Sequence, residues 1–249
     1  MQRLMASKVP QVTLFFWVIK ILSTTMGETL ADWMDATFHL GLTGTTLVCG
    51  AAFIAMLFWQ MRTRAYVPAV YWATVILVSI TGTLITDNLT DGFGVSLYVS
   101  TAIFAILLAV VFRLWWRQER TLDIASINTT RREAWYWLAI LVTFALGTAA
   151  GDLITEGWGL GYGPGLALFA ALVAGCYIAY RARVNEVLTF WIAYVLTRPL
   201  GASLGDLLTA PTRTNADYDY TGFGLPRYGV NVLFLAGVIG LVVYLSIKI

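Results

Sequence analysis

The sequence predicts an all-α integral membrane protein with eight transmembrane helices, arranged as four parallel repeats of two helices each. Its 249 residues are 59% hydrophobic and only 12% charged, whereas a soluble domain is roughly 45–50% apolar and about 25% charged. The apolar residues occur in runs long enough to cross a bilayer, for which a helix needs about 20 residues. This composition excludes a soluble enzyme and a nucleic-acid-binding module.

The first half of the chain contains four apolar runs separated by charged or glycine-rich segments. We expect helices at 12–31, 38–60, 66–87 and 94–116. The first run also resembles a secretory signal peptide, because Arg3 and Lys8 precede it. We interpret it as a span because it carries a motif that recurs in three later runs.

The second half begins after a polar stretch at 118–133. Four further apolar runs predict helices at 134–153, 160–180, 187–208 and 225–247. A long loop from Leu207 to Phe223 separates the last two helices and contains Asp217, Tyr218, Asp219 and Tyr220 in succession.

Basic residues are distributed unequally between the two sides that this topology creates. Only Arg213 and Arg227 lie on the side of the odd-to-even connections. Twelve of the sixteen lie on the other side: Arg3, Lys8, Arg62, Arg64, Arg113, Arg117, Arg120, Arg131, Arg132, Arg181, Arg183 and Lys248. Since positive charge concentrates in cytoplasmic loops, we expect both the N and C termini to be cytoplasmic.

One motif occurs four times with identical spacing, once in each odd-numbered helix. It consists of an aromatic residue followed by Trp, then Gly ten residues after the Trp and Asp fifteen residues after it. The four copies are Phe16, Trp17, Gly27 and Asp32; Tyr71, Trp72, Gly82 and Asp87; Tyr136, Trp137, Gly147 and Asp152; and Phe190, Trp191, Gly201 and Asp206. Four ungapped copies indicate an internal repeat.

The motif divides the chain into four repeats and one linker. We place the repeats at 1–65, 66–117, 134–186 and 187–249, and we interpret 118–133 as a cytoplasmic linker. Because each repeat has two helices, all four copies of the motif enter the membrane in the same direction. Such repeats are related by an axis along the membrane normal. The motif glycines suit close helix contact, and we expect the odd helices to line the centre and the even helices to face lipid.

The chain resembles a family of bacterial inner-membrane proteins made of four tandem repeats of unknown function, labelled only as membrane-anchored. Each repeat of that family has two transmembrane segments and a signature tryptophan, and the tryptophans of this chain stand at that place: Trp17, Trp72, Trp137 and Trp191. The resemblance extends from Trp17 to the last helix and implies a multi-pass protein of the bacterial inner membrane. It implies no particular activity. The long loop of the fourth repeat departs from the other three.

The motif aspartates are candidate cation ligands. Each lies at the C-terminal end of a helix, where the helix dipole disfavours an anion, so a cation, a basic partner or a proton is expected nearby. The plainer interpretation is that each motif aspartate is solvated by water at the level of the lipid headgroups. Glu28 lies one turn deeper than Asp32, inside an apolar span where carboxylates are rare and often functional. Thr83 and Thr148 occupy the equivalent places of repeats 2 and 3, and repeat 4 has Ala202 there.

Lys20 and Arg198 are candidate charge partners of these acids, because both lie within predicted spans. Lys20 has one plain interpretation and one sharper one. It either reaches the cytoplasmic interface with its long side chain or forms a counter-charge in the span. Arg198 forms either a structural ion pair with Glu28 or a motif Asp, or a movable counter-charge that is released when a cation or proton binds the carboxylate.

The leading functional hypothesis is a secondary transporter of a cation. Oxygen ligands favour Mn²⁺, Mg²⁺, Ca²⁺ or protons, and the metal candidates are Glu28, Asp32, Asp87, Asp152 and Asp206. The single His39, together with Cys49 and Cys176 in apolar runs, argues against a soft metal and any cofactor beyond a divalent cation. Two alternatives stay open: a proton-coupled carrier of an organic solute with the motif tryptophans as its pocket, and a non-transporting membrane scaffold.

The expected partners are the lipid bilayer and a small ion or solute, and no nucleic acid. No His-Glu-x-x-His segment is present, and we do not expect an enzyme. The oligomeric state is open.

Overall fold

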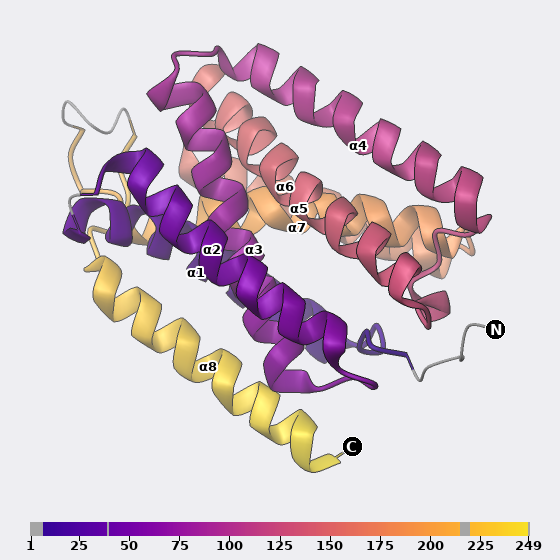
Figure 1. Ribbon diagram of the computed structural model, residues 1–249. Coiled ribbons are helices and arrows are strands. Elements are labelled where there is room, and N and C mark those ends of the chain that lie inside the picture. The colour runs from indigo at the N-terminus through magenta and orange to yellow at the C-terminus, as the bar shows by residue number, and fades with distance from the viewer. Residues whose placement is uncertain (1–6, 39, 215–219, 249) are drawn as a thin grey trace.

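The computed structural model describes residues 7–38, 40–214 and 220–248, and within these ranges it contains helices and no strands (Figure 1). Eight of the helices are long and apolar enough to cross a membrane. They are α1 (Leu14–Phe38), α2 (Gly41–Arg62), α3 (Pro68–Asp87), α4 (Leu97–Glu119), α5 (Thr130–Asp152), α6 (Tyr162–Arg181), α7 (Glu186–Thr209) and α8 (Arg227–Lys248). The prediction of an all-helical protein with eight spans is confirmed. Arg3, His39 and the run from Asp217 to Asp219 lie outside the described residues.

Two helices extend at least four residues beyond their predicted ends. Helix α1 continues to Phe38 rather than ending at 31, because its last turns still pack on α2, where Met34 Sδ lies 3.8 Å from Cys49 Sγ. Helix α5 begins at Thr130 rather than at 134, and the side chain of Thr129 accepts a hydrogen bond from the backbone N–H of Arg132. A hydroxyl at this position caps the free N–H groups of a first helical turn.

Two of the motif helices continue into a short π-helical turn. Asn88–Gly92 follows α3 directly after Asp87, and Leu153–Gly157 follows α5 directly after Asp152. Such turns are rare and occur frequently at functional sites. Helices α1 and α7 have no such turn, so the repeats already differ from one another at the level of their motif aspartates.

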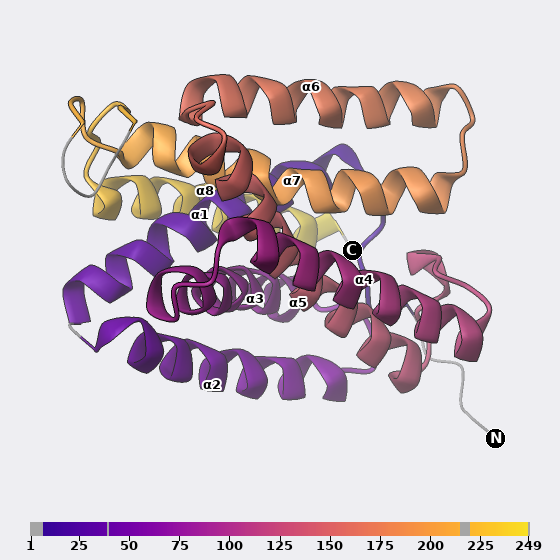
Figure 2. The same ribbon diagram turned by 90° about the horizontal axis from the view of Figure 1, so that it is seen from above.

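The four odd helices form a closed ring in which α1 packs on α3, α3 on α5, α5 on α7 and α7 on α1. Each even helix packs outside this ring, mainly on the odd helix of the following repeat: α2 on α3, α4 on α5, α6 on α7 and α8 on α1. In Figure 2, α2 and α6 lie along opposite edges of the bundle. The contacts therefore repeat four times around one axis.

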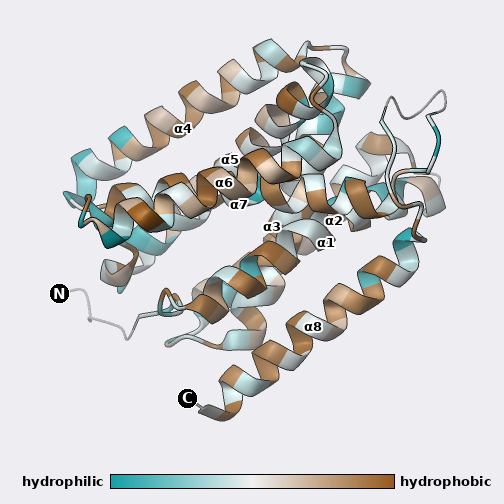
Figure 3. Ribbon diagram, turned by 180° about the vertical axis from the view of Figure 1, so that it is seen from behind, coloured by the Kyte–Doolittle hydropathy of each residue, from teal (hydrophilic) through white to brown (hydrophobic). Residues whose placement is uncertain are grey.

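Burial follows this arrangement. Between 61% and 72% of each odd span is buried, against 17–22% of each even span. The outer helix α8 is apolar over most of its length (Figure 3). This confirms that odd helices line the centre and leaves the even helices to face the bilayer.

The motif glycines explain why neighbouring odd helices approach so closely. A Cβ atom added to any of the four would meet a side-chain atom of the next odd helix at only 2.0–2.7 Å, which is far inside van der Waals contact. The four pairs are Gly27 with Ser79, Gly82 with Phe144, Gly147 with Arg198 and Gly201 with Thr24. In every pair the partner lies seven residues after the motif Trp of the following repeat, and the fourth pair closes the ring.

The aromatic pair of the motif makes a second closed set of contacts. The first aromatic residue of each repeat packs against the Trp of the following repeat, with ring centroids 5.5–6.3 Å apart. The pairs are Phe16 with Trp72, Tyr71 with Trp137, Tyr136 with Trp191 and Phe190 with Trp17. Offset and edge contacts at such separations stabilise aromatic pairs. The motif tryptophans thus join neighbouring repeats.

Candidate functional site

The polar residues of the odd helices lie in layers along the axis of the ring. We call the end that holds the motif tryptophans the aromatic end, and the end that holds the motif aspartates the acidic end. Because the four motifs share one spacing on helices that run in the same direction, equivalent residues lie at similar depth. Between the two ends lie Lys20, Arg198 and Glu28, all of them buried.

A buried ion pair joins the first and last odd helices at the centre. Arg198 Nη2 on α7 donates a short hydrogen bond to Glu28 Oε2 on α1. The Arg198 side chain is fully buried and the Glu28 side chain is 10% exposed. Such a pair gains strong Coulombic attraction in a low-dielectric interior, but each charge has lost its hydration. Removing one partner is therefore far more damaging than removing both.

Two threonines from the remaining odd helices complete this layer. Arg198 Nη2 donates to Thr83 Oγ1 on α3 and, at 2.8 Å, to Thr148 Oγ1 on α5. Glu28, Thr83 and Thr148 all lie eleven residues after their motif Trp. The fourth repeat has Ala202 at this position and instead supplies Arg198 from one turn earlier. The four repeats therefore converge on one guanidinium.

The hydrogen bonds of this guanidinium are distributed unevenly. Three acceptors share Nη2, which has only two N–H bonds, whereas Nε and Nη1 are buried and have no partner in the described part of the chain. Buried polar groups nearly always have a partner, and those that do not call for an explanation such as a bound water or ion.

Lys20 lies closer to the aromatic end and faces α7. Its Nζ donates to Thr197 Oγ1 at 2.6 Å and to the Tyr194 carbonyl at 3.0 Å, and it lies 4.0 Å from the centroid of the Tyr194 ring. The side chain is fully buried. The interpretation that Lys20 reaches the membrane interface is therefore wrong. Acceptors on α7, far away in sequence, hold it in the interior instead.

The motif aspartates lie at the acidic end and are half-buried. Asp32 is the one that forms an ion pair among the described residues, with Arg227 of α8 at 3.6 Å. Within residues 7–38, 40–214 and 220–248, no three histidine, cysteine or acidic side chains come close enough to hold a metal ion together. The five acids proposed as metal ligands thus share a depth but do not form a ready-made cluster, and metal binding there stays a prediction.

Two buried polar contacts lie outside the predicted site. Asn231 of α8 donates from Nδ2 to the Thr29 carbonyl at 3.2 Å and accepts a bond from the Thr29 hydroxyl. A lone Asn in the last apolar run was the signal for it. Near the aromatic end, Lys8 Nζ lies 2.7 Å from Glu133 Oε2, and Gln60 Nε2 donates to Glu133 Oε1 at 3.1 Å. No pattern in the sequence pairs Lys8 with Glu133, because Lys8 precedes the first motif and Glu133 ends the predicted linker.

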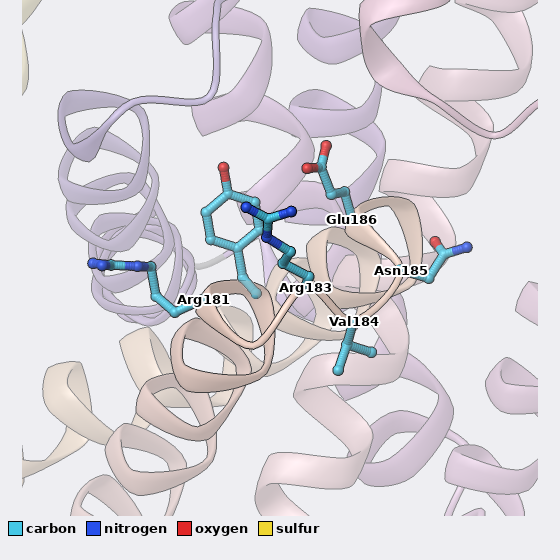
Figure 4. A pocket seen from close by; sticks show the side chains of 6 residues that line it. Arg181, Arg183, Val184, Asn185 and Glu186 are labelled. Carbon is cyan, nitrogen blue, oxygen red and sulfur yellow. The ribbon is translucent and has the colours of Figure 1, made fainter.

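A surface hollow of 480 Å³ lies at the connection between α6 and α7 (Figure 4). Exposed residues line it: Tyr180, Arg181, Arg183, Val184, Asn185 and Glu186. It contains no residue of the central axis, so it is separate from the candidate site.

Comparison with known proteins places the chain in a family. The family described as Repeat of Unknown Function (DUF347) matches residues 15–66, 70–121, 135–184 and 189–248. The chain belongs to this family, which confirms the resemblance drawn from the four tryptophan motifs. Searches of curated proteins and of solved structures gave no match.

Proposed function

We propose that this multi-pass membrane protein is a secondary transporter of a cation, and that Glu28 is the carboxylate to which the cation, or a proton exchanged for it, binds. The observation that carries the proposal is the buried Glu28–Arg198 pair on the axis of the helix ring. Ionisable residues inside a membrane bundle are expensive to bury and typically mark ion or proton pathways. We place the protein in the bacterial inner membrane, as the sequence resemblance implies.

The acidic end supplies a route to Glu28. Four half-buried aspartates lie at the acidic end, which we take as the mouth of the axis, and an excess of one sign of charge raises the local concentration of the opposite ion. Glu28 lies one turn deeper than Asp32 and keeps a small exposed fraction of 8%. With the termini in the cytoplasm, as the distribution of basic residues predicts, this mouth faces away from the cytoplasm.

Arg198 supplies the counter-charge for the empty state. When no cation is bound, the guanidinium neutralises Glu28. A cation that binds Glu28 takes over this role, so the arginine loses its partner and its position on the axis becomes less favourable. The neighbouring Thr83 hydroxyl, 3.3 Å from Glu28 Oε2, is a hard oxygen ligand of the kind that Mn²⁺, Mg²⁺ and Ca²⁺ prefer. Water and backbone carbonyls would complete such a coordination shell.

Flux in proteoliposomes tests the proposal. The purified protein is reconstituted and uptake of Mn²⁺, Mg²⁺, Ca²⁺ and Na⁺ is measured with and without a pH gradient. The Glu28→Gln variant, which keeps the shape and loses the charge, is expected to abolish the flux of the transported cation. Glu186→Gln makes the same chemical change at an exposed site and serves as the matched control.

Three results would contradict the proposal. The first is no flux of any cation in the wild type, which favours a scaffold. The second is equal flux in wild type and Glu28→Gln. The third is flux that is lost equally in Glu186→Gln, since that variant does not touch the axis.

A further inference from the structure

We infer that the same axis contains an anion site, in which the free N–H groups of Arg198 bind a small anion, either an inorganic ion such as chloride or a carboxylate group. This goes beyond the proposed cation transport and does not depend on it, because it rests on the donors of Arg198 and not on the acids.

The first argument is the inventory of donors. An arginine side chain presents N–H donors in a fixed planar fork and has no acceptor. All bonds of Arg198 to protein groups involve Nη2, while Nε and Nη1 are buried without a partner among the described residues. The acceptors around the guanidinium are thus gathered on Nη2. The N–H groups of Nε and Nη1 lie on the two opposite edges of the guanidinium, and each is left for another species.

The second argument is the balance of charge. The buried middle of the odd helices contains two basic side chains, Lys20 and Arg198, and one acidic side chain, Glu28. In the described part of the chain, no carboxylate lies within 4.0 Å of Lys20 Nζ, which bonds only to neutral oxygens of α7. Lys20 is held by Thr197, the residue before Arg198, so both basic groups belong to one neighbourhood. The motif aspartates lie at the acidic end and form no ion pair with Lys20 among the described residues, so an anion beside Lys20 and Arg198 would supply the negative partner that Lys20 lacks.

The third argument is a set of buried hydroxyls without partners. Ser23, Ser79 and Thr143 are buried, and none of their side-chain oxygens has a hydrogen-bond partner in the described residues. They lie six or seven residues after their motif Trp, which is the level of Thr197 and Arg198 in the fourth repeat. Hydroxyls can donate to an anion, and they are rarely left unpaired in an apolar interior.

These arguments favour an anion over a water molecule. A water would satisfy the N–H bonds of Arg198, whose charge Glu28 already balances. It would leave the charge of Lys20 without an acidic partner in a medium where an unpaired charge is strongly disfavoured. Close helix packing at the motif glycines limits the size of the occupant, so we expect a halide or a single carboxylate group rather than a larger polyanion.

Anion binding competes with Glu28 for the same guanidinium. Glu28 already forms a charged hydrogen bond with Arg198, so neutralising Glu28 makes the whole fork available. The anion is therefore expected to bind more tightly whenever Glu28 carries no charge. If cation transport through Glu28 also holds, cation and anion would favour each other's binding.

Equilibrium binding of labelled anions to the purified full-length protein tests the inference. The probes are ³⁶Cl⁻ and ¹⁴C-acetate, measured separately at constant sodium with gluconate as the balancing ion. The two labels distinguish an inorganic ion from a carboxylate. We expect Arg198→Lys, which keeps the charge and loses the fork, to weaken binding by about tenfold or more, the scale of one charged hydrogen bond. Glu28→Gln should strengthen it by about the same factor.

The control is Arg181→Lys, which makes the same change at an exposed position and should leave anion affinity unchanged. Retention of neither label by the wild type overturns the inference and assigns the free N–H groups to water. Equal affinity in Arg198→Lys and the wild type also overturns it. Should Arg198→Lys fail to fold, Glu28→Gln decides, because an affinity no higher than that of the wild type contradicts the competition. Cation flux is measured separately, so failure of the anion site leaves the proposed function intact.

Discussion

At the aromatic end of the axis the four repeats make the same contact four times, whereas in the layer of Glu28 and Arg198 only repeats 2 and 3 contribute the same residue type. Ring pairs such as Phe16 with Trp72 and Phe190 with Trp17 are interchangeable in kind and in distance. Eleven residues after the Trp, by contrast, the chain has a glutamate, two threonines and an alanine. Symmetry is kept where the repeats pack together and is lost where charged groups meet. The asymmetric layer is therefore where we look for chemistry.

The largest expected effect comes from breaking the asymmetric layer. Arg198→Met leaves Glu28 buried without its partner, which destabilises a protein by about 3–5 kcal/mol. The double variant Arg198→Met with Glu28→Gln should recover most of that loss, because no buried charge is left unpaired. Unfolding by denaturant in mixed micelles measures both. Equal stability of the single and double variants would show that the pair is not coupled.

A smaller effect is expected where the repeats pack. Gly82→Ala forces a Cβ to within 2.7 Å of Phe144 Cβ, and overpacking of this kind costs about 1–3 kcal/mol. Gly50→Ala is the matched control, since an added Cβ there meets nothing within 4 Å and alanine favours a helix. The same unfolding measurement applies. A cost for Gly50→Ala as large as that for Gly82→Ala would contradict the close approach of α3 and α5.

The smallest effect on stability is expected at the acidic end. The Asp32–Arg227 pair is partly exposed on both sides, 30% and 28%, and such pairs contribute about 0–1 kcal/mol. Asp32→Asn should therefore leave the unfolding midpoint nearly unchanged. It should nevertheless reduce the rise of this midpoint on addition of the transported cation, because a ligand stabilises only the folded state that binds it. If the cation raises the unfolding midpoint of Asp32→Asn as much as that of the wild type, Asp32 does not contribute to cation binding.

Much of the fold could be predicted from the sequence because membrane spans depend on local apolar length. The end of α1 was wrong, since the polar residues from Asp32 onward resemble a helix terminus, although Met34 continues to pack on α2. The contacts that close the ring of odd helices could not be predicted in this way, because they join residues far apart in the sequence. Spacing predicts that Gly27 lies in a close contact, but it does not say that Ser79 of the next repeat is the partner.

The candidate site could be predicted in part. Glu28, Thr83, Thr148 and Arg198 were chosen because of depth and chemistry, and the structure brings all four together. The position of a residue along its helix predicts its depth, but it does not predict how far its side chain lies from those of the other odd helices. The four aspartates share a level yet do not form a metal cluster among the described residues. The partners of Lys20 could not be predicted for the same reason, because Tyr194 and Thr197 lie on the last odd helix.

The contact between α1 and α7 joins the first and the last of the odd helices to be synthesised. Glu28 and Arg198 are 170 residues apart, and a ribosome adds roughly 5–20 residues per second. The first helix is thus inserted about 10–30 s before the arginine that neutralises its carboxylate is made. Helix α8, the outer neighbour of α1, arrives later still. During this interval the nascent chain contains Glu28 and Lys20 without α7, the helix that supplies Arg198 to Glu28 and the acceptors of Lys20.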